Sequence, residues 1–158
     1  MNALMEFFKD MFGNFYLMSV ACAWILAQII KIFTGYFHDD HFNMRKFLFG
    51  TGGMPSSHSA TVMSLVVASA IVNGAGSYQF AASLLLAIIV MSDAMVVRLE
   101  TGKQAQILNE IIDTFSIFSR DKLPEVQLKE FVGHTPVQVA AGITIGIINA
   151  CIMYYCIL

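Results

Sequence analysis

Four apolar stretches, each about 20 residues long, restrict this sequence to folds that can place them in a membrane. They cover residues 15–33, 56–72, 80–97 and 137–157. A helix of about 20 residues is about 30 Å long, which is the thickness of the hydrocarbon core of a bilayer. The composition agrees, because 57% of the residues are hydrophobic and 13% are charged. We therefore expect one all-α integral membrane domain over residues 1–158, with about four transmembrane helices in an antiparallel bundle.

A different pattern lies between the third and fourth stretches, where polar residues become frequent. Apolar side chains recur there at helical spacing, with acidic residues such as Glu110 and Asp113 between them. This spacing predicts an amphipathic helix that lies on the membrane or on the other helices. Its acidic face offers no attraction to anionic lipid. The apolar positions are Ile107, Leu108, Ile111, Ile112, Phe115 and Phe118.

The net charge of the chain limits the kinds of molecule that it can bind. A formal net charge of −2 provides no basic surface for nucleic acid, which leaves the lipid bilayer and a small anionic ligand. The three cysteines, Cys22, Cys151 and Cys156, lie in apolar stretches, where they behave as small hydrophobic residues. No cleavage pattern of a removed signal peptide follows the first apolar stretch, so we expect the first span to remain. The oligomeric state is open, a homo-oligomer included.

The sequence Gly-Gly-Met-Pro-Ser-Ser-His-Ser-Ala, at residues 52–60, combines backbone freedom, a helix start and a titratable side chain. The glycines allow the backbone to approach a ligand closely, and Pro55 suits the first position of a helix. A helix that begins here directs its free amides and positive dipole end toward Ser56, Ser57 and His58. The stretch therefore predicts an anion-binding site, with a simple capped turn as the alternative.

A second histidine, His134, also stands immediately before an apolar stretch, between a glycine and a Thr-Pro pair. Four spans with short connections place both histidines on one side of the membrane, together with the cations Lys31, Arg45 and Arg98. Like charges repel unless an anion lies between them, so the cluster predicts a phosphate ligand. For Lys31 and Arg98, which lie near the ends of spans, snorkelling to the interface is the alternative.

Two imidazoles beside a phosphate have complementary chemical roles, because one can be neutral and the other protonated near neutral pH. One attacks phosphorus and the other gives a proton to the leaving alcohol, while cations and helix amides hold the remaining oxygens. This chemistry requires no metal and no cofactor. Metal binding by His38, Asp39, Asp40 and His41, in the first connection, is an alternative, but no further ligand set accompanies them.

Asp93 lies inside the third span, where a carboxylate is costly and marks a functional or paired position. We predict that it pairs with Arg98, Lys31 or an imidazole instead of facing lipid, with a structural hydrogen bond to a neighbouring helix as the alternative. We also predict that the side chains of His58 and His134 lie within roughly 10 Å of each other. That is the space of one phosphate with a hydrogen bond on each side.

Residues 54–60, Met-Pro-Ser-Ser-His-Ser-Ala, resemble the second signature motif of the type-2 phosphatidic acid phosphatase superfamily. With the glycines before it, residues 93–98 in the third span and Gly-His-Thr-Pro at residues 133–136, the chain is similar to the superfamily's divergent, small bacterial and plastid-type branch. That branch is related to acid phosphatases and vanadium-dependent haloperoxidases. The resemblance covers residues 28–142 and implies a phosphohistidine mechanism, with His134 as the nucleophile and His58 as the acid.

The chain departs from the superfamily pattern at two motifs. The first signature is a lysine with Arg-Pro seven positions later, and here only Lys31 is present. The third signature has Ser-Arg six positions before its histidine and an aspartate four positions after, where this chain has Leu128 and Gln138. Gln138 cannot stabilise an imidazolium by charge. Asp93 can take the part of that acid from the third span, with Arg98 as a displaced phosphate clamp.

These observations predict a membrane-embedded phosphatase that acts on a lipid phosphate or diphosphate. The alternative is a non-catalytic membrane protein that binds a phosphorylated lipid or supports a membrane assembly, which the uncharged Gln138 favours. The catalytic candidates are His134, His58 and Asp93. The substrate-binding candidates are Lys31, Arg45, Gly53, Ser56, Ser57, Arg98 and Gln138.

The distribution of basic residues predicts the orientation in the membrane, because lysine and arginine in short loops favour the cytoplasm. The first and third connections hold Arg45, Lys46, Lys103, Arg120, Lys122 and Lys129, and the second connection holds none. We therefore expect a multi-pass protein of a bacterial plasma membrane, with both termini outside and the site facing the cytoplasm. An aromatic belt is expected at the outer side, from Phe15, Tyr16, Tyr78, Phe80, Tyr154 and Tyr155.

Overall fold

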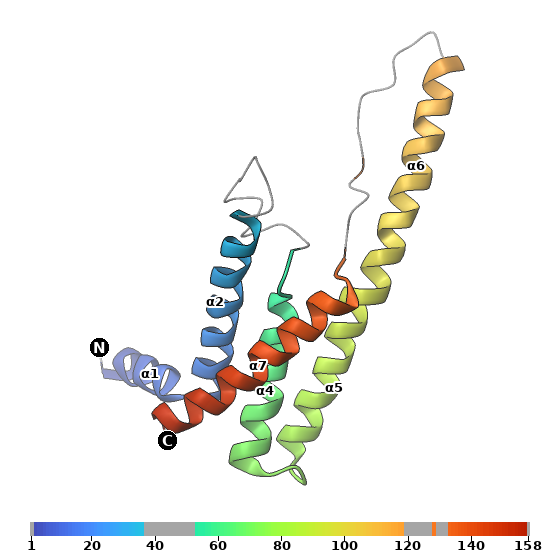
Figure 1. Cartoon of the computed structure of the whole chain (residues 1–158). Helices are drawn as coiled ribbons and strands as arrows, with labels where there is room; N and C mark the ends of the chain where they lie inside the picture. Colours follow the sequence, from blue (N-terminus) through green and yellow to red (C-terminus); the bar gives the residue numbers. More distant parts are fainter. Residues whose placement is uncertain (1, 37–52, 119–127, 129–132, 158) are drawn as a thin grey trace.

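The computed structural model describes residues 2–36, 53–118, 128 and 133–157, and the regular structure in these ranges is helical. The predicted all-α class is therefore confirmed. Figure 1 shows the elements in chain order, which are α1 (Asn2–Gly13), α2 (Phe15–Tyr36), α4 (Ser57–Asn73), α5 (Tyr78–Ser92), the π-helical turn η1 (Asp93–Val97), α6 (Arg98–Phe118) and α7 (Pro136–Ile157).

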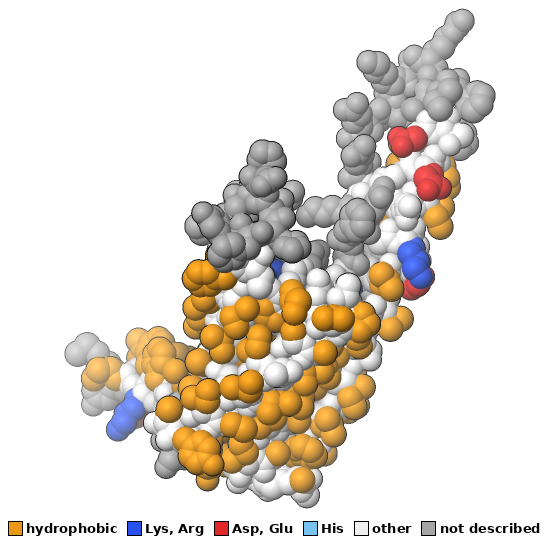
Figure 2. Space-filling model, viewed as in Figure 1, with side chains coloured by type: hydrophobic (Ala, Val, Ile, Leu, Met, Phe, Trp, Pro, Cys, Tyr) orange, Lys and Arg blue, Asp and Glu red, His pale blue; other side chains and the backbone are white. Residues whose placement is uncertain are grey.

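Three stretches of the described helices are long and apolar enough to cross a membrane, by length and composition. They are Phe15–Thr34, Tyr78–Thr114 and Pro136–Cys156. α4 is also apolar, but its 17 residues make a helix of about 26 Å, which is shorter than a typical span. Figure 2 shows hydrophobic side chains over much of the body that these helices form. The protein is therefore a membrane protein, and the expected count of four antiparallel spans stays a prediction.

α4 contacts α2, α5 and α7, and its backbone comes closest to α7. A Cβ atom on Gly142 would lie 2.4 Å from the carbonyl oxygen of Ser56, and one on Gly146 would lie 2.5 Å from that of Ala60. Small residues at four-residue spacing are what allows membrane helices to pack so closely. This contact fixes the register of α4 against α7, and so the relative position of the residues at their N-terminal ends.

A buried polar network joins three helices farther along the same contact. The hydroxyl oxygens of Ser19 in α2 and Ser64 in α4 lie 2.8 Å apart. Asn149 in α7 donates through Nδ2 to the Ser19 carbonyl oxygen at 2.9 Å and to Ser64 Oγ at 3.2 Å. Buried polar groups are stable when they are hydrogen-bonded, and here each bond crosses between helices. The network therefore holds α2, α4 and α7 in one arrangement.

α5, η1 and α6 form one continuous rod, and α6 extends beyond the other helices (Figure 1). The helical pattern expected around residues 107–118 is present, but it continues the third apolar helix instead of forming a separate helix that lies on its neighbours. Charged residues alone do not end a helix, and no proline lies between Tyr78 and Phe118. The apolar side chains of Ile107, Leu108 and Ile111 are exposed.

α1 was not expected from the sequence. It is separated from α2 by Asn14, whose Oδ1 accepts hydrogen bonds from the N–H groups of Tyr16 at 3.0 Å and Leu17 at 3.2 Å. An asparagine that accepts from the following amides is an N-cap, so it begins a new helix. α1 and the C-terminal end of α7 lie at the end of α2 that is distant from Tyr36 (Figure 1).

Candidate functional site

The first turn of α4 presents His58. The sequence predicts Pro55 as the first helical residue, but the helix begins at Ser57 and Ser56 is its N-cap. Ser56 Oγ accepts from the N–H of Ser59 at 3.3 Å and from its hydroxyl at 3.0 Å. A serine whose side chain can accept from the helix amides is the stronger start signal, which explains the correction. Pro55 precedes the cap, after a cis peptide bond from Met54.

Hydrogen bonds hold this helix start against two other helices. The N–H of Ser56 donates to the carbonyl oxygen of Gln138 in α7 at 3.0 Å. Thr34 in α2 donates through Oγ1 to the carbonyl oxygen of Met54 at 2.6 Å. The N–H groups of Ser57 and His58, in contrast, have no acceptor among the described residues. The first turn of α4 therefore offers two backbone donors at a fixed place.

The π turn η1 positions His134. The N–H of Arg98 donates to the carbonyl oxygen of Asp93, so the Ala94 carbonyl, which Arg98 would occupy in an α-helix, is available to another donor. The N–H of His134 donates to it at 3.0 Å. Gly133 allows the close approach, because its φ is +114° and a Cβ there would lie 3.2 Å from the Leu99 nitrogen. The turn before α7 is thus fixed to the middle of the long rod.

A capping box at the start of α7 orients the ring of His134. Gln138 Oε1 accepts from the N–H of Thr135 at 3.1 Å, and the N–H of Gln138 faces Thr135 Oγ1 at 3.4 Å. His134 Nδ1 lies 3.1 Å from the same Oε1. Because a backbone N–H can only donate, the atom that faces it must be the amide oxygen, and His134 Nδ1 must therefore carry the proton. The neutral ring then has its lone pair on Nε2.

The structure brings the two histidines together. The ring centroids of His58 and His134 lie 6.3 Å apart, and the ring planes are tilted by 55°. This distance is inside the roughly 10 Å expected from one shared phosphate. His134 is buried, with 8% of its surface exposed, whereas His58 is exposed. One ring is thus held in the protein, and the other faces it from the helix start.

Lys31 in α2 lies against the glycine that precedes the α4 start. Its side chain is buried, and its Cε would be 2.8 Å from a Cβ atom on Gly53. Gly53 also has a φ of +85°, which residues with a side chain rarely adopt. Any larger residue at position 53 would therefore displace Lys31. The charge of Lys31 acts on both His58 and His134.

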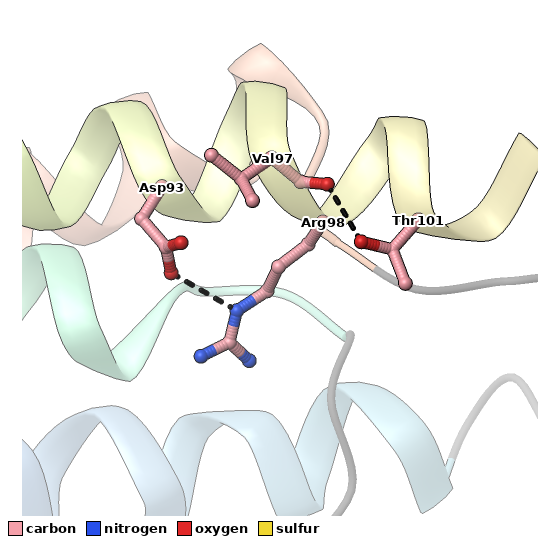
Figure 3. A network of polar contacts seen from close by, with 4 residues as sticks. All are labelled: Asp93, Val97, Arg98 and Thr101. Atoms are coloured by element: carbon pink, nitrogen blue, oxygen red, sulfur yellow. Dashed lines mark hydrogen bonds and ion pairs between the residues drawn. The ribbon is translucent and has the colours of Figure 1, made fainter. Parts of the chain in front are cut away.

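Asp93 and Arg98 form an ion pair at the edge of this group (Figure 3). Arg98 Nε donates to Asp93 Oδ2 at 3.3 Å, so the predicted pairing of Asp93 is confirmed. The two terminal nitrogens of Arg98 point away from Asp93 and have no partner among the described residues. The pair is partly exposed, and such pairs add little to stability. The ion pair instead orients Arg98, because Nε faces Asp93 and the two terminal nitrogens are left at the opposite edge of the guanidinium.

The electrostatic setting of His134 favours the neutral ring. Burial lowers the pKa of His134 below its ordinary value of 6.5, and the charges of Lys31, His58 and Arg98 lower it further. The hydrogen bond with Gln138 acts in the opposite direction and raises this pKa, but the net shift is downward. Near neutral pH the ring of His134 is therefore neutral, with its lone pair on Nε2.

Among the ten site residues expected from the sequence, several lie together. The group consists of Lys31, Gly53, His58, Asp93, Arg98, His134 and Gln138. Ser56 and Ser57 border it, but the Ser56 side chain is buried in the helix cap, and the Ser57 carbonyl accepts from Thr61. Arg45 and the histidine–aspartate run at residues 38–41 lie outside the described residues.

Three features that position the site were not expected from the sequence. They are the Ala94 carbonyl that holds His134, the Thr34 hydroxyl that holds Met54, and the close contact at Gly142. Small-residue spacing in α4 and α7 is a sequence signal for the third. The first two involve a backbone atom and an ordinary threonine, for which the sequence carries no signal.

Comparisons with known proteins point to one family. A family model described as the divergent PAP2 family matches residues 12–149 of this chain. A protein of Bacillus subtilis (strain 168), named uncharacterized membrane protein YuiD, is 34% identical over 155 residues, which cover 92% of this chain and 98% of that protein. No solved structure matches this chain.

Proposed function

Because this chain belongs to the divergent PAP2 family of membrane proteins, we propose that it is a membrane-embedded phosphatase that hydrolyses a lipid phosphate or diphosphate. The observation that carries the proposal is the pair of rings 6.3 Å apart, one with its tautomer fixed and the other exposed. A separation of this size accommodates one phosphoryl group in contact with both imidazoles. Two histidines that only stabilised the fold would not need to lie within the influence of the charges of Lys31 and Arg98.

The roles in this proposal rest on the tautomer of His134 and not on a difference in pKa, because burial lowers the pKa of both His134 and His58. His134 Nε2 attacks phosphorus, because its ring is neutral and Gln138 holds the proton on the other nitrogen. The bond between phosphorus and the lipid oxygen breaks, and His58 gives its proton to that oxygen. Water then attacks the phosphohistidine, with His58 as the base that accepts a proton from it. These steps release inorganic phosphate and return His58 to its protonated form and His134 to its neutral, unphosphorylated form.

Cations and amides stabilise the phosphoryl oxygens in this proposal. Arg98 is oriented by Asp93 so that its two terminal nitrogens are open, which suits bidentate contact with a phosphate. The N–H groups of Ser57 and His58, which have no acceptor in the part of the chain that the structure describes, add donors at the positive end of the α4 dipole. Lys31 contributes charge from α2. Asp93 therefore acts by positioning Arg98 and not by contacting the reacting atoms.

The surroundings of the site favour a lipid substrate. The site lies where α2 ends and α4 and α7 begin, next to exposed apolar side chains such as Met54. A headgroup can enter such a site while its acyl chains remain between apolar helices. We propose that α4 crosses the membrane with the three longer helices in an antiparallel bundle, and that the site faces the cytoplasm of a bacterial plasma membrane.

A second candidate function is binding of a phosphorylated lipid without turnover, or support of a membrane assembly. Gln138 favours it, because an amide fixes the tautomer of His134 but does not stabilise an imidazolium by charge. The same cations and amides would then hold the phosphate permanently.

Release of inorganic phosphate distinguishes the two candidates. The purified protein is incubated with a panel of lipid monophosphates and diphosphates, and the His134→Ala variant is compared with it. Variants of the chain's other two histidines, His38→Ala and His41→Ala, are matched controls. The phosphatase proposal predicts release by the wild type and both controls, and none by His134→Ala. Saturable binding with no release by any form would support the second candidate.

A further inference from the structure

α1 is amphipathic, although it is only 12 residues long. At 100° per residue its polar positions, Asn2, Glu6, Lys9, Asp10 and Gly13, fall within one arc, and its apolar positions occupy the rest of the circumference. The apolar positions are Ala3, Leu4, Met5, Phe7, Phe8, Met11 and Phe12. Such a clean separation is expected only for a helix that buries one side.

No described part of the chain buries that side. Leu4, Met5, Phe7 and Phe12 each expose more than 60% of their surface, and Phe8 exposes 45%. Exposed apolar patches that contain several large side chains are interaction surfaces in soluble and membrane proteins alike. α1 therefore has its partner outside the described fold.

The chain connection limits where that partner can be. Asn14 alone separates α1 from α2, the first of the helices that are long and apolar enough to cross a membrane. α1 is thus held at the boundary of the bilayer, and its axis lies across that of α2 (Figure 1). Twelve residues give a helix of about 18 Å, which is too short to cross a hydrocarbon core of about 30 Å. The position suits a helix that lies in the plane of the membrane.

We propose that α1 is an interfacial helix, whose apolar side enters the lipid surface at the membrane face opposite the two histidines. The C-terminal end of α7, which carries Tyr154 and Tyr155, lies on the same side of the molecule as α1 (Figure 1). The ring centroids of Phe15 and Tyr154 lie 6.4 Å apart. Amphipathic aromatic residues of this kind occur at the headgroup level of membranes. The occupant of the apolar side of α1 is therefore lipid and not a protein.

The charge on α1 determines what kind of lipid surface it needs. Its ionisable side chains are Glu6, Lys9 and Asp10, so it has no excess of basic residues. Polybasic helices gain attachment from anionic headgroups, whereas this one depends on apolar burial. Its insertion is expected to be the same in zwitterionic and anionic membranes.

Two single-cysteine variants of the full chain test the proposal. In a background that lacks Cys22, Cys151 and Cys156, Phe8→Cys labels the apolar side and Glu6→Cys the polar side, about 160° away around the helix. Each carries an environment-sensitive fluorophore in phosphatidylcholine vesicles. Quenching by nitroxide-labelled lipid is compared with quenching by iodide present on both sides of the membrane. Leu4→Cys and Asp10→Cys form a second pair if one of the first fails to fold.

The proposal predicts several-fold stronger lipid quenching on the apolar side and several-fold stronger iodide quenching on the polar side. The difference should not change when a third of the lipid is phosphatidylglycerol. Equal iodide quenching at both positions would show that α1 projects into water and would overturn the proposal. Protection of the apolar position from both quenchers would also overturn it, because a protein surface would then cover that side. Neither result depends on phosphatase activity.

Discussion

His58 and His134 lie with their rings 6.3 Å apart, although they belong to different helix starts and only one of them is buried. The close packing of α4 on α7 brings them together, since Gly142 and Gly146 allow the two backbones to touch. The π turn adds a second constraint by accepting the N–H of His134. Packing, and not a local motif, therefore creates the distance on which the proposed chemistry depends.

The two histidines should differ in their response to the leaving group. If His58 is the acid, His58→Ala should lower kcat by about 10²- to 10⁴-fold for a lipid phosphate, whose alcohol needs a proton to leave. The loss should be much smaller for an aryl phosphate, whose phenolate leaves without one. His134→Ala should abolish turnover of both substrates. Equal losses for both substrates in His58→Ala would contradict the assignment.

The proposed phosphatase activity should depend on pH in a way that reflects the lowered pKa of His134. Burial lowers the pKa of His134 below 6.5, so the nucleophile stays neutral as the pH falls through 6.5. The acid limb of kcat/KM should therefore have its midpoint below pH 6.5. The free energy of unfolding should also decrease at low pH. The histidine of the unfolded chain takes up a proton at about pH 6.5, before the folded protein does, so stability is lost as the pH falls from about 6.5 toward the pKa of His134 in the folded protein. A midpoint above 6.5 would contradict this description of His134.

Gln138→Glu tests whether Gln138 controls His134. The carboxylate still accepts from the N–H of Thr135, so the start of α7 is retained, but its charge raises the pKa of His134. The acid limb should move to higher pH. Gln138→Ala removes the acceptor and should lower kcat without that upward shift. If the acid limb of the kcat/KM profile has the same midpoint in Gln138→Glu as in the wild type, Gln138 does not influence the pKa of His134.

The sequence predicted which side chains form the site, but it did not predict the backbone features that position them. Apolar stretches and the two histidines at helix starts were sufficient to expect an all-α membrane protein with neighbouring imidazoles. The pairing of Asp93 with Arg98 was expected, but its geometry was not. Residues five apart lie about 140° apart on an α-helix, and the π turn is what brings them to one side. No sequence pattern marks where one extra residue enters a helical turn.

Other differences have equally local causes. Pro55 suits a first helical position, yet Ser56 supplies a cap that proline cannot, so the helix begins after it. The amphipathic spacing of residues 2–13 is a sequence signal for α1, and the cap formed by Asn14 separates this helix from α2. α6 continues α5 because the π turn at residues 93–97 shifts the backbone hydrogen bonding by one residue without ending the helix. In each case the start or the continuation of a helix depends on hydrogen bonds that form only when the neighbouring residues have taken up their folded positions.

Asp93→Asn should reduce substrate binding through Arg98. Without the carboxylate the guanidinium loses its fixed orientation, and we expect kcat/KM to fall by about tenfold, the effect of one charge-assisted hydrogen bond of roughly 1.5 kcal/mol. Glu100→Gln is the matched control, because it breaks an exposed ion pair with Lys103 in the neighbouring part of the same rod. That control should change kcat/KM by less than twofold. Equal effects of the two variants would exclude a specific role for Asp93.

Gly142→Ala should destabilise the protein and disturb the site. Its Cβ would lie 2.4 Å from the Ser56 carbonyl oxygen, so α4 and α7 must move apart at the end that carries both histidines. Overpacking of this kind costs roughly 1–3 kcal/mol, which thermal unfolding in detergent measures. Gly76→Ala is the control, since nothing lies within 4 Å of its added Cβ. An unchanged unfolding temperature for Gly142→Ala would contradict the close contact.

The orientation can be tested at the turn between α4 and α5. A single cysteine at Ser77, in a variant that lacks the three native cysteines, should react with a membrane-impermeant thiol reagent in intact cells. This follows because the turn carries no basic residue and lies at the end of α4 distant from the histidines. Protection until the membrane is opened would place the histidine site outside the cytoplasm.

Detection of a phosphorylated form of the protein tests the proposed phosphohistidine mechanism most directly. Radiolabelled lipid monophosphates and diphosphates are mixed with the protein, and the reaction is stopped with base, in which a phosphohistidine is stable and a phosphoserine ester is not. The wild type should acquire a label that acid removes, His58→Ala should retain it at least as long, and His134→Ala should acquire none. Phosphate release without any labelled protein, or a label that persists in His134→Ala, would contradict a phosphohistidine at His134.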